Sequence, residues 1–115
     1  MHIITDSTIN SLKRLFKKLT APDAIAIICQ IFGASNAVIY INEKQFVIYE
    51  LTYDYHLNNL MAEDVDVKFF GGPNGGWFNG TLLTLLLDHA LFCLSKDKSH
   101  KIVEAVRWMS EVKCG

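Results

Sequence analysis

The segment AVIYINEKQFVIYEL, residues 37–51, decides the fold class of this protein. It contains two runs of β-branched and aromatic residues, 37–41 and 46–51, and the polar residues 42–45 lie between them. Such runs, joined by a short polar segment, are typical of a β-hairpin. Because both runs are apolar at nearly every position instead of at alternate positions, they also predict a sheet that is covered on both faces.

The segments on either side of the hairpin add helices and a strand. A first amphipathic helix is expected to be capped within residues 6–8 and to carry a basic outer side. A second helix, apolar almost all round, is expected from residues 20–21 to Gly33, because glycine allows the left-handed conformation that ends many helices. After the hairpin, the alternating segment VDVKFF, residues 65–70, predicts a third strand.

Two further helices are expected in the last third of the chain. One covers residues 82–94, with Asn79 as its cap, and its few polar side chains share a narrow stripe. The other starts at Asp97 or Ser99 and has an apolar stripe at helical spacing.

Together these elements predict the α+β class. A small, mainly antiparallel sheet, made from the hairpin 37–51 and a strand near 65–70, is expected to pack with about four helices. The chain has 115 residues, of which 50% are hydrophobic and 20% charged, so a folded core is expected instead of a disordered chain. Residues 1–115 are therefore predicted to form a single compact domain.

Charge, cysteines and hydropathy limit the partners and the location that the sequence predicts. The net charge of -1 argues against a nucleic-acid partner, because such proteins normally carry a basic excess. Three cysteines without paired spacing, and no signal-peptide pattern, predict reduced thiols and a cytoplasmic location. No apolar run approaches the roughly 20 residues of a membrane helix, so no membrane partner is expected.

A glycine-rich segment, GGPNGGWFNG at residues 71–80, holds five of the seven glycines. Glycine-rich turns before helices can bind anions, but this one lacks the spacing of the known phosphate-binding motifs and is interpreted as a surface turn. Its aromatic pair, Trp77 and Phe78, lies among residues too small to bury it. The pair either folds over the core or belongs to a partner-binding surface, where tryptophan is enriched.

His89 and Cys93 are the strongest candidates for catalysis. They share a face of a predicted helix, as a Cys–His nucleophile pair requires. That face also carries leucines, and burial among leucines keeps a thiol protonated. We therefore expect a core histidine and an inert thiol, and the sequence predicts no catalytic residue, no metal site and no cofactor.

Acidic residues are concentrated in one part of the chain. Residues 43–66 contain six acids and one base, whereas residues 1–20 contain four bases and one acid. An acidic edge beside exposed aromatics suits a basic protein partner, although the same acids also serve to keep a hydrophobic hairpin soluble. The predicted partner-binding residues are Glu50, Asp54, Glu63, Asp64, Asp66, Trp77 and Phe78.

Two resemblances bear on function. Residues 25–50 resemble the opening of a GAF or related sensory domain, with a helix, a Gly-Ala-Ser-Asn turn and an apolar hairpin, although the helical second half departs from that order. The small size, acidic side and lack of a catalytic motif resemble bacterial immunity or inhibitor proteins in kind. The sequence therefore predicts a non-enzymatic protein-binding module that masks a basic partner. The GAF-like alternative is a small-ligand sensing domain with its site near residues 71–80, and homodimerisation is left open.

Overall fold

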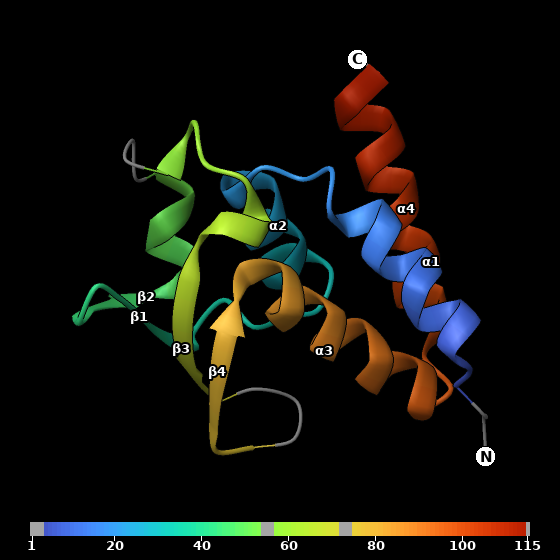
Figure 1. Cartoon of the computed structure of the whole chain (residues 1–115), viewed down its shortest axis with the longest axis horizontal. Helices are drawn as coiled ribbons and strands as arrows, with labels where there is room; N and C mark the ends of the chain where they lie inside the picture. The colour runs from blue at the N-terminus through green and yellow to red at the C-terminus, as the bar shows by residue number, and fades with distance from the viewer. Residues whose placement is uncertain (1–3, 54–56, 72–74, 115) are drawn as a thin grey trace.

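The computed structural model describes residues 4–53, 57–71 and 75–114 (Figure 1). The strands gather at one end of the molecule and α1 and α4 lie at the other, and α3 (Leu82–Ser95) leads from the sheet towards them. The molecule extends over 38 × 36 × 21 Å. It is therefore flat, and its thin direction holds about two layers of secondary structure, since packed layers lie roughly 10 Å apart.

The described residues form one antiparallel sheet with the strand order β2-β1-β3-β4. The strands are β1 (Val38–Ile41), β2 (Lys44–Val47), β3 (Asp66–Phe70) and β4 (Trp77–Thr81). The α+β class, the hairpin and the third strand are confirmed. Strand β4 was not expected, because the surrounding glycines indicated a turn; pairing with β3 along its whole length holds this segment extended.

The hairpin turn is tighter than the sequence suggested. Only Asn42 and Glu43 lie between the paired strands, and their φ angles are 52° and 66°. Positive φ at both positions is the signature of the type I′ turn, whose twist matches that of the flanking strands. The second strand consequently begins at Lys44, two residues earlier than expected.

The second strand also ends early, at Val47. The following segment, η1 (Ile48–Tyr53), forms a 3-10 helix instead of extending the strand. In a 3-10 helix, side chains three residues apart lie on the same side. Ile48 and Leu51 are both buried in this way, so the helical turn places two side chains in the core where a strand would have placed alternate residues.

Replacing Glu43 with glycine is expected to raise the free energy of unfolding by about 0.5–1 kcal/mol. Glutamate is strained at a positive φ, whereas glycine adopts it freely, and this relief exceeds the extra backbone entropy that glycine loses on folding. Urea unfolding of the two proteins measures the difference. Asn42→Gly is the matched control and should gain less, because asparagine tolerates the left-handed region. A lower stability of the E43G variant would contradict this explanation.

Three of the four α-helices in the described ranges begin at threonine caps. The four helices are α1 (Asp6–Phe16), α2 (Ala21–Gln30), α3 and α4 (Ser99–Cys114), and the caps belong to the first three. The hydroxyls of Thr5, Thr20 and Thr81 each accept a hydrogen bond from the backbone N–H three residues later. The second helix starts as predicted, and Gly33 adopts the expected left-handed φ of 78° after it. The cap of the first helix lies just before the expected residues, and Asn79 is no cap because β4 continues through it.

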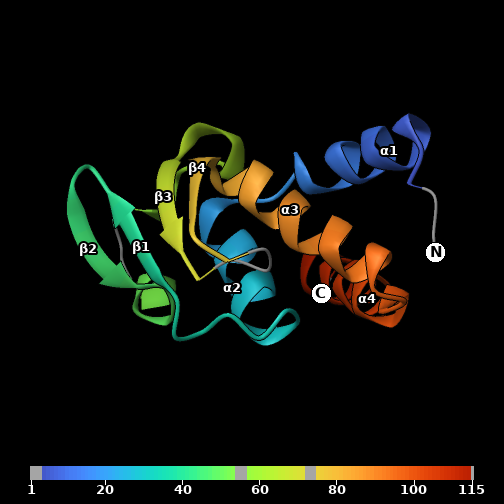
Figure 2. The same cartoon turned by 90° about the horizontal axis from the view of Figure 1, so that it is seen from below.

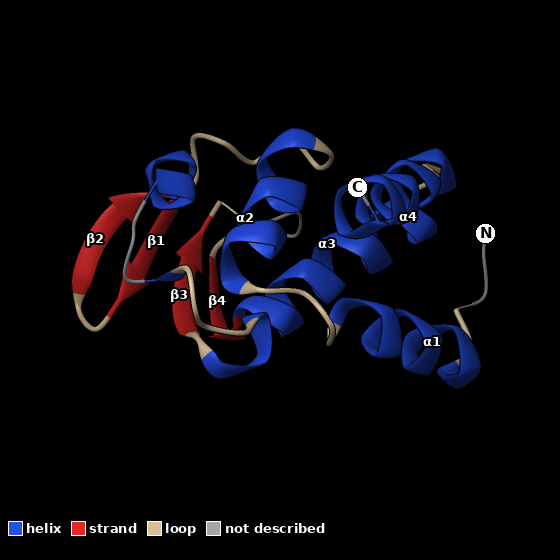
Figure 3. Cartoon of the chain, turned by 90° about the horizontal axis from the view of Figure 1, so that it is seen from above, coloured by secondary structure: helices blue, strands red, loops and turns tan. Residues whose placement is uncertain are grey.

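Within residues 4–53, 57–71 and 75–114, secondary structure covers only one face of the sheet. Helix α3 contacts β3 and β4, and η1, which packs on α2, contacts β2. Figures 2 and 3 show the helices to one side of the sheet, where Ile39 and Phe69 are fully buried. Facing the other way, Phe70 and Trp77 are 47% and 61% exposed. The expectation of a sheet covered on both faces is wrong, because antiparallel strands can bury alternate residues and leave the others in water.

Helix α3 lies at the centre of the hydrophobic core. It contacts α1, α2 and α4 as well as the sheet. Its buried residues are Leu82, Leu85, Leu86, Leu87, His89, Ala90 and Cys93. The nearly uninterrupted apolar sequence of this helix is thus explained by neighbours on most of its sides.

Candidate functional site

Strand pairing sets the chemistry of the uncovered side of the sheet, which we call the open face. Residues paired across neighbouring strands point to the same side, and successive residues along a strand point to opposite sides. The open face therefore carries two rows of side chains. In strand order, one row is Val47, Val38, Phe70 and Trp77, and the other is Gln45, Tyr40, Lys68 and Asn79.

Three rings on the open face, Tyr40, Phe70 and Trp77, form an aromatic cluster. The centroid of the Trp77 ring lies 5.0 Å from that of Phe70 and 5.5 Å from that of Tyr40. Tyr40 leans over β3 to reach Trp77, and its hydroxyl donates a 2.9 Å hydrogen bond to Gln45 Oε1. Because these contacts restrain the rings, little side-chain entropy remains to be lost when a partner covers them.

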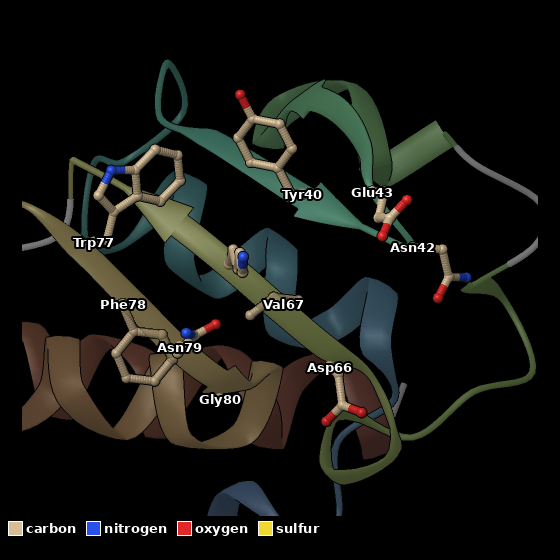
Figure 4. A pocket seen from close by; sticks show the side chains of 10 residues that line it. Tyr40, Asn42, Glu43, Asp66, Val67, Trp77, Phe78, Asn79 and Gly80 are labelled. Carbon is tan, nitrogen blue, oxygen red and sulfur yellow. The ribbon is translucent and has the colours of Figure 1, made fainter.

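A hollow of about 860 Å³ adjoins the aromatic cluster (Figure 4). Tyr40 and Trp77 stand at one end, and Glu43 and Asp66 lie towards the other. The hollow forms where β1 and β3 part, because their pairing stops at Tyr40 and Lys68. Both the hairpin turn and the start of β3 therefore contribute charged side chains to it.

The charged residues of the hollow are Glu43, Asp66 and Lys68. All three are exposed, and none of them makes an ion pair within the described parts of the chain. The hollow thus presents two carboxylates and one ammonium group next to apolar rings. Such a site can bind a polar or cationic group through the carboxylates while the rings cover its apolar part.

The structure brings three of the predicted partner-binding residues together. Asp66, Trp77 and Phe78 all line the hollow. The two aromatics nevertheless differ, since they are neighbours in one strand. Trp77 projects from the open face, whereas Phe78 points towards the helices and packs against the core. Phe78 therefore folds over the core, as one of the two interpretations of this pair predicts, whereas Trp77 is exposed.

The other predicted acids are dispersed. A carboxylate oxygen of Glu63 lies 4.0 Å from the ammonium group of Lys17, the residue that follows α1. Asp64 borders a second, smaller hollow of about 450 Å³. Glu50 is exposed on η1 and lines neither hollow, and Asp54 lies outside the described residues.

Several residues of the site were missed from the sequence. They are Tyr40, Glu43, Lys68, Phe70 and Asn79. Alternation in β3 could have identified Lys68 and Phe70, because they fall opposite the buried Val67 and Phe69. The contribution of β1 could not have been found in that way, because it depends on which strands are neighbours.

His89 is a core residue, as expected. Its Nδ1–H donates a 2.9 Å hydrogen bond to the carbonyl oxygen of Leu85, and its ring packs against Phe69 and Phe32 at centroid distances of 5.6 and 5.9 Å. Burial lowers the pKa of His89, and the hydrogen bond to Leu85 and the charge of Asp88 oppose this effect only in part. The imidazole is therefore neutral in the folded protein near pH 7.

This lowered pKa makes stability depend on pH. The unfolded chain takes up a proton at His89 near pH 6.5, whereas the folded protein resists it, so stability is complete above this pH and falls as the pH decreases. The loss reaches at most about 1.4 kcal/mol per pH unit, until the folded-state pKa is passed. Urea unfolding at pH 7.5 and 5.5 should show a smaller decrease for His89→Leu than for the native protein. The control variant His100→Gln, at an exposed position of α4, should show the same decrease in unfolding free energy as the native protein. Equal decreases in all three proteins would contradict the role of His89 in the pH dependence.

Cys29 and Cys93 are buried thiols without the features of a nucleophile. Burial raises the pKa of Cys29 to about 11. Burial also raises the pKa of Cys93, although Lys98 and Lys101 act in the opposite direction. Both groups are thus protonated near neutral pH, and the recorded side-chain hydrogen bond of His89 goes to a backbone carbonyl instead of to Cys93.

Metal-binding groups, membrane-spanning helices and similarity to known proteins give no further indication of function. In the part of the chain that the structure describes, no three His, Cys, Asp or Glu side chains are grouped to hold a metal ion. None of the helices within the described ranges is both long and apolar enough to cross a membrane. No family model, no curated protein and no solved structure matches this chain. Function is therefore inferred from the residues of the open face and its hollow.

Proposed function

We propose that this chain is a non-enzymatic protein-binding module, and that the open face with its hollow is the docking surface. The observation that supports this most is Trp77, which is 61% exposed and contacts two further rings. Single apolar residues are common on protein surfaces, whereas contiguous exposed aromatics on an uncovered sheet are typical of interaction sites. Tryptophan and tyrosine are also the residue types enriched at interface hot spots.

The charges beside the rings favour a basic partner. Glu43 and Asp66 line the hollow, and Asp64 lies two residues before the second of these. Opposite charge on a partner would speed the encounter, and the aromatic cluster would then anchor the complex. A small protein with this surface would act by covering the partner's own basic site, as an inhibitor or immunity-type protein does.

The test is comparative affinity purification from the native source. The native chain and a Trp77→Ala/Phe70→Ala variant serve as baits, and bound proteins are quantified by mass spectrometry. Removing two hot-spot rings should reduce recovery of the partner at least about tenfold, because each such truncation costs on the order of 1–2 kcal/mol of binding. The partner should also be basic, and its recovery should fall as salt increases.

Val103→Ala is the matched control for loss of an exposed apolar side chain. Val103 is 56% exposed and lies on α4, at the opposite end of the molecule from the sheet (Figure 1). This variant should recover the partner as the native chain does. If the same proteins bound the native chain and the double variant equally, with both folded by circular dichroism, the open face would not be the docking surface.

A small-ligand sensing domain is the second candidate. The hollow of about 860 Å³ is of the size that small-molecule sites usually have, and it adjoins β4, which includes the end of the glycine-rich segment. A ligand that fills it should raise the melting temperature of the native chain in a metabolite panel and leave that of a Trp77→Ala variant unchanged. Small-ligand sensing would be favoured over protein binding by two results together. One is a ligand with this effect, and the other is an unchanged set of proteins bound to the Trp77→Ala/Phe70→Ala bait.

A further inference from the structure

We propose that the hollow receives an arginine side chain of the partner, with its guanidinium group between the carboxylates of Glu43 and Asp66 and its stem against Trp77. This inference rests on the proposed docking function and names the chemistry that the surface recognises. It follows from the combination, in one hollow, of aromatic rings with two acids that have no basic partner among the described residues.

The carboxylates are placed to receive a cation from outside the chain. Glu43 comes from the hairpin turn and Asp66 from the start of β3, and both line the same hollow. Neither is paired with a base inside the described parts of the chain. A planar guanidinium group carries five N–H donors and can bind carboxylates with two hydrogen bonds at once, which a lysine ammonium group cannot match.

The rings supply the rest of the site. Tyr40 and Trp77 line the hollow with their centroids 5.5 Å apart, and Figure 4 shows both rings raised above the strands on the same side. Aromatic faces attract cations and cover the methylene groups of an arginine stem. In the proposed complex, a side chain that enters along the rings directs its charged end towards the part of the hollow that Glu43 and Asp66 line.

Lys68 distinguishes a cationic ligand of the hollow from an anionic one. It lines the same hollow and is exposed between β1 and β4 in the sheet. Its positive charge opposes a cationic ligand and favours an anionic one, such as a single-stranded nucleic acid stacked on the rings. Removal of this charge should therefore strengthen the binding of arginine and weaken the binding of an oligonucleotide.

The experiment is an NMR titration of the full chain with Nα-acetyl-arginine amide. The indole N–H resonance of Trp77 reports binding, and that of Trp108, the second tryptophan, serves as the internal reference. The native chain should show a saturable shift with an affinity on the order of millimolar, as expected for a single side chain. Nα-acetyl-citrulline amide, which has the same shape and no charge, should produce at most a weak, unsaturated shift.

Three variants locate the site. Glu43→Gln combined with Asp66→Asn should weaken arginine binding at least about fivefold, since two charged contacts are lost. Glu104→Gln, which removes an exposed acid from α4, should leave the affinity unchanged. Lys68→Met should strengthen the binding of arginine by about twofold to fivefold.

Three results would overturn the inference. The first is equal binding of the arginine and citrulline amides, and the second is equal binding of arginine to the native chain and the double-acid variant. The third is a saturable Trp77 shift with octauridylate that Lys68→Met abolishes, which would assign the rings to a nucleic acid. If the arginine amide does not bind but the Trp77→Ala/Phe70→Ala variant loses its protein partner, only the arginine site is wrong. If the arginine amide does not bind and that variant also retains the partner, the proposed docking surface is wrong as well.

Discussion

Replacing Phe69 with alanine is expected to lower the free energy of unfolding by about 3–5 kcal/mol. Phe69 is fully buried in β3, between β1 and β4, and its ring is nearly perpendicular to that of His89, with the two centroids 5.6 Å apart. Alanine would leave a cavity between the sheet and α3, because both sides are held by their own secondary structure and cannot close fully. A loss of this size is a large fraction of the about 5–15 kcal/mol by which small domains are stable. Urea unfolding followed by circular dichroism measures it.

Phe70 is the matched control, because it is the next residue of the same strand and points to the open face. At 47% exposure, its ring contributes to stability mainly through Trp77, so Phe70→Ala should cost no more than about 1 kcal/mol. A similar cost for both variants would mean that the open face is covered in the folded protein. That result would contradict the arrangement of the sheet as well as the proposed docking surface.

Replacing Gly80 with alanine should destabilise the protein by about 1–3 kcal/mol, although alanine normally favours ordered structure over glycine. A methyl group at this position would lie 2.6 Å from Thr84 Oγ1 and 3.0 Å from the Phe78 ring. The threonine cannot move away freely, because its hydroxyl accepts a 2.9 Å hydrogen bond from the N–H of Thr81 and donates one of 2.9 Å to its carbonyl oxygen. The substitution therefore disrupts the capping box that starts α3.

A double-mutant cycle tests this explanation. Thr84→Ala alone should cost about 1 kcal/mol, since it removes the cap's second half. In that background, Gly80→Ala meets a smaller side chain, and the hydrogen bonds of the Thr84 hydroxyl are already absent, so its cost should be less than in the native protein. Strictly additive costs, measured as unfolding free energies in urea, would show that Gly80 is required for a reason other than the cap.

The candidate site was predictable only in part. Asp66 and Trp77 were predicted as partner-binding residues because the acids are concentrated in one stretch of the chain and the tryptophan lies among residues too small to bury it. Glu43 was counted among the acids, but its place in the same hollow as Trp77 was not foreseen, since the hairpin turn and β4 are far apart in the sequence. Tyr40 was assigned to a doubly covered strand, whereas its ring lies on the open face against Trp77.

The local elements of this protein are determined by the sequence itself. The helix from Ala21 and the third strand follow from a cap, a period of apolar residues or an alternation, all of which act over a few neighbouring residues. The tertiary structure alone decided that β4 pairs with β3, that one face of the sheet stays open, and that Trp77 and Phe78 serve opposite sides. These outcomes depend on which distant segments pair and on which face of the sheet the helices cover. The sequence of a single strand is compatible with burial of either of its faces until the rest of the chain packs against one face.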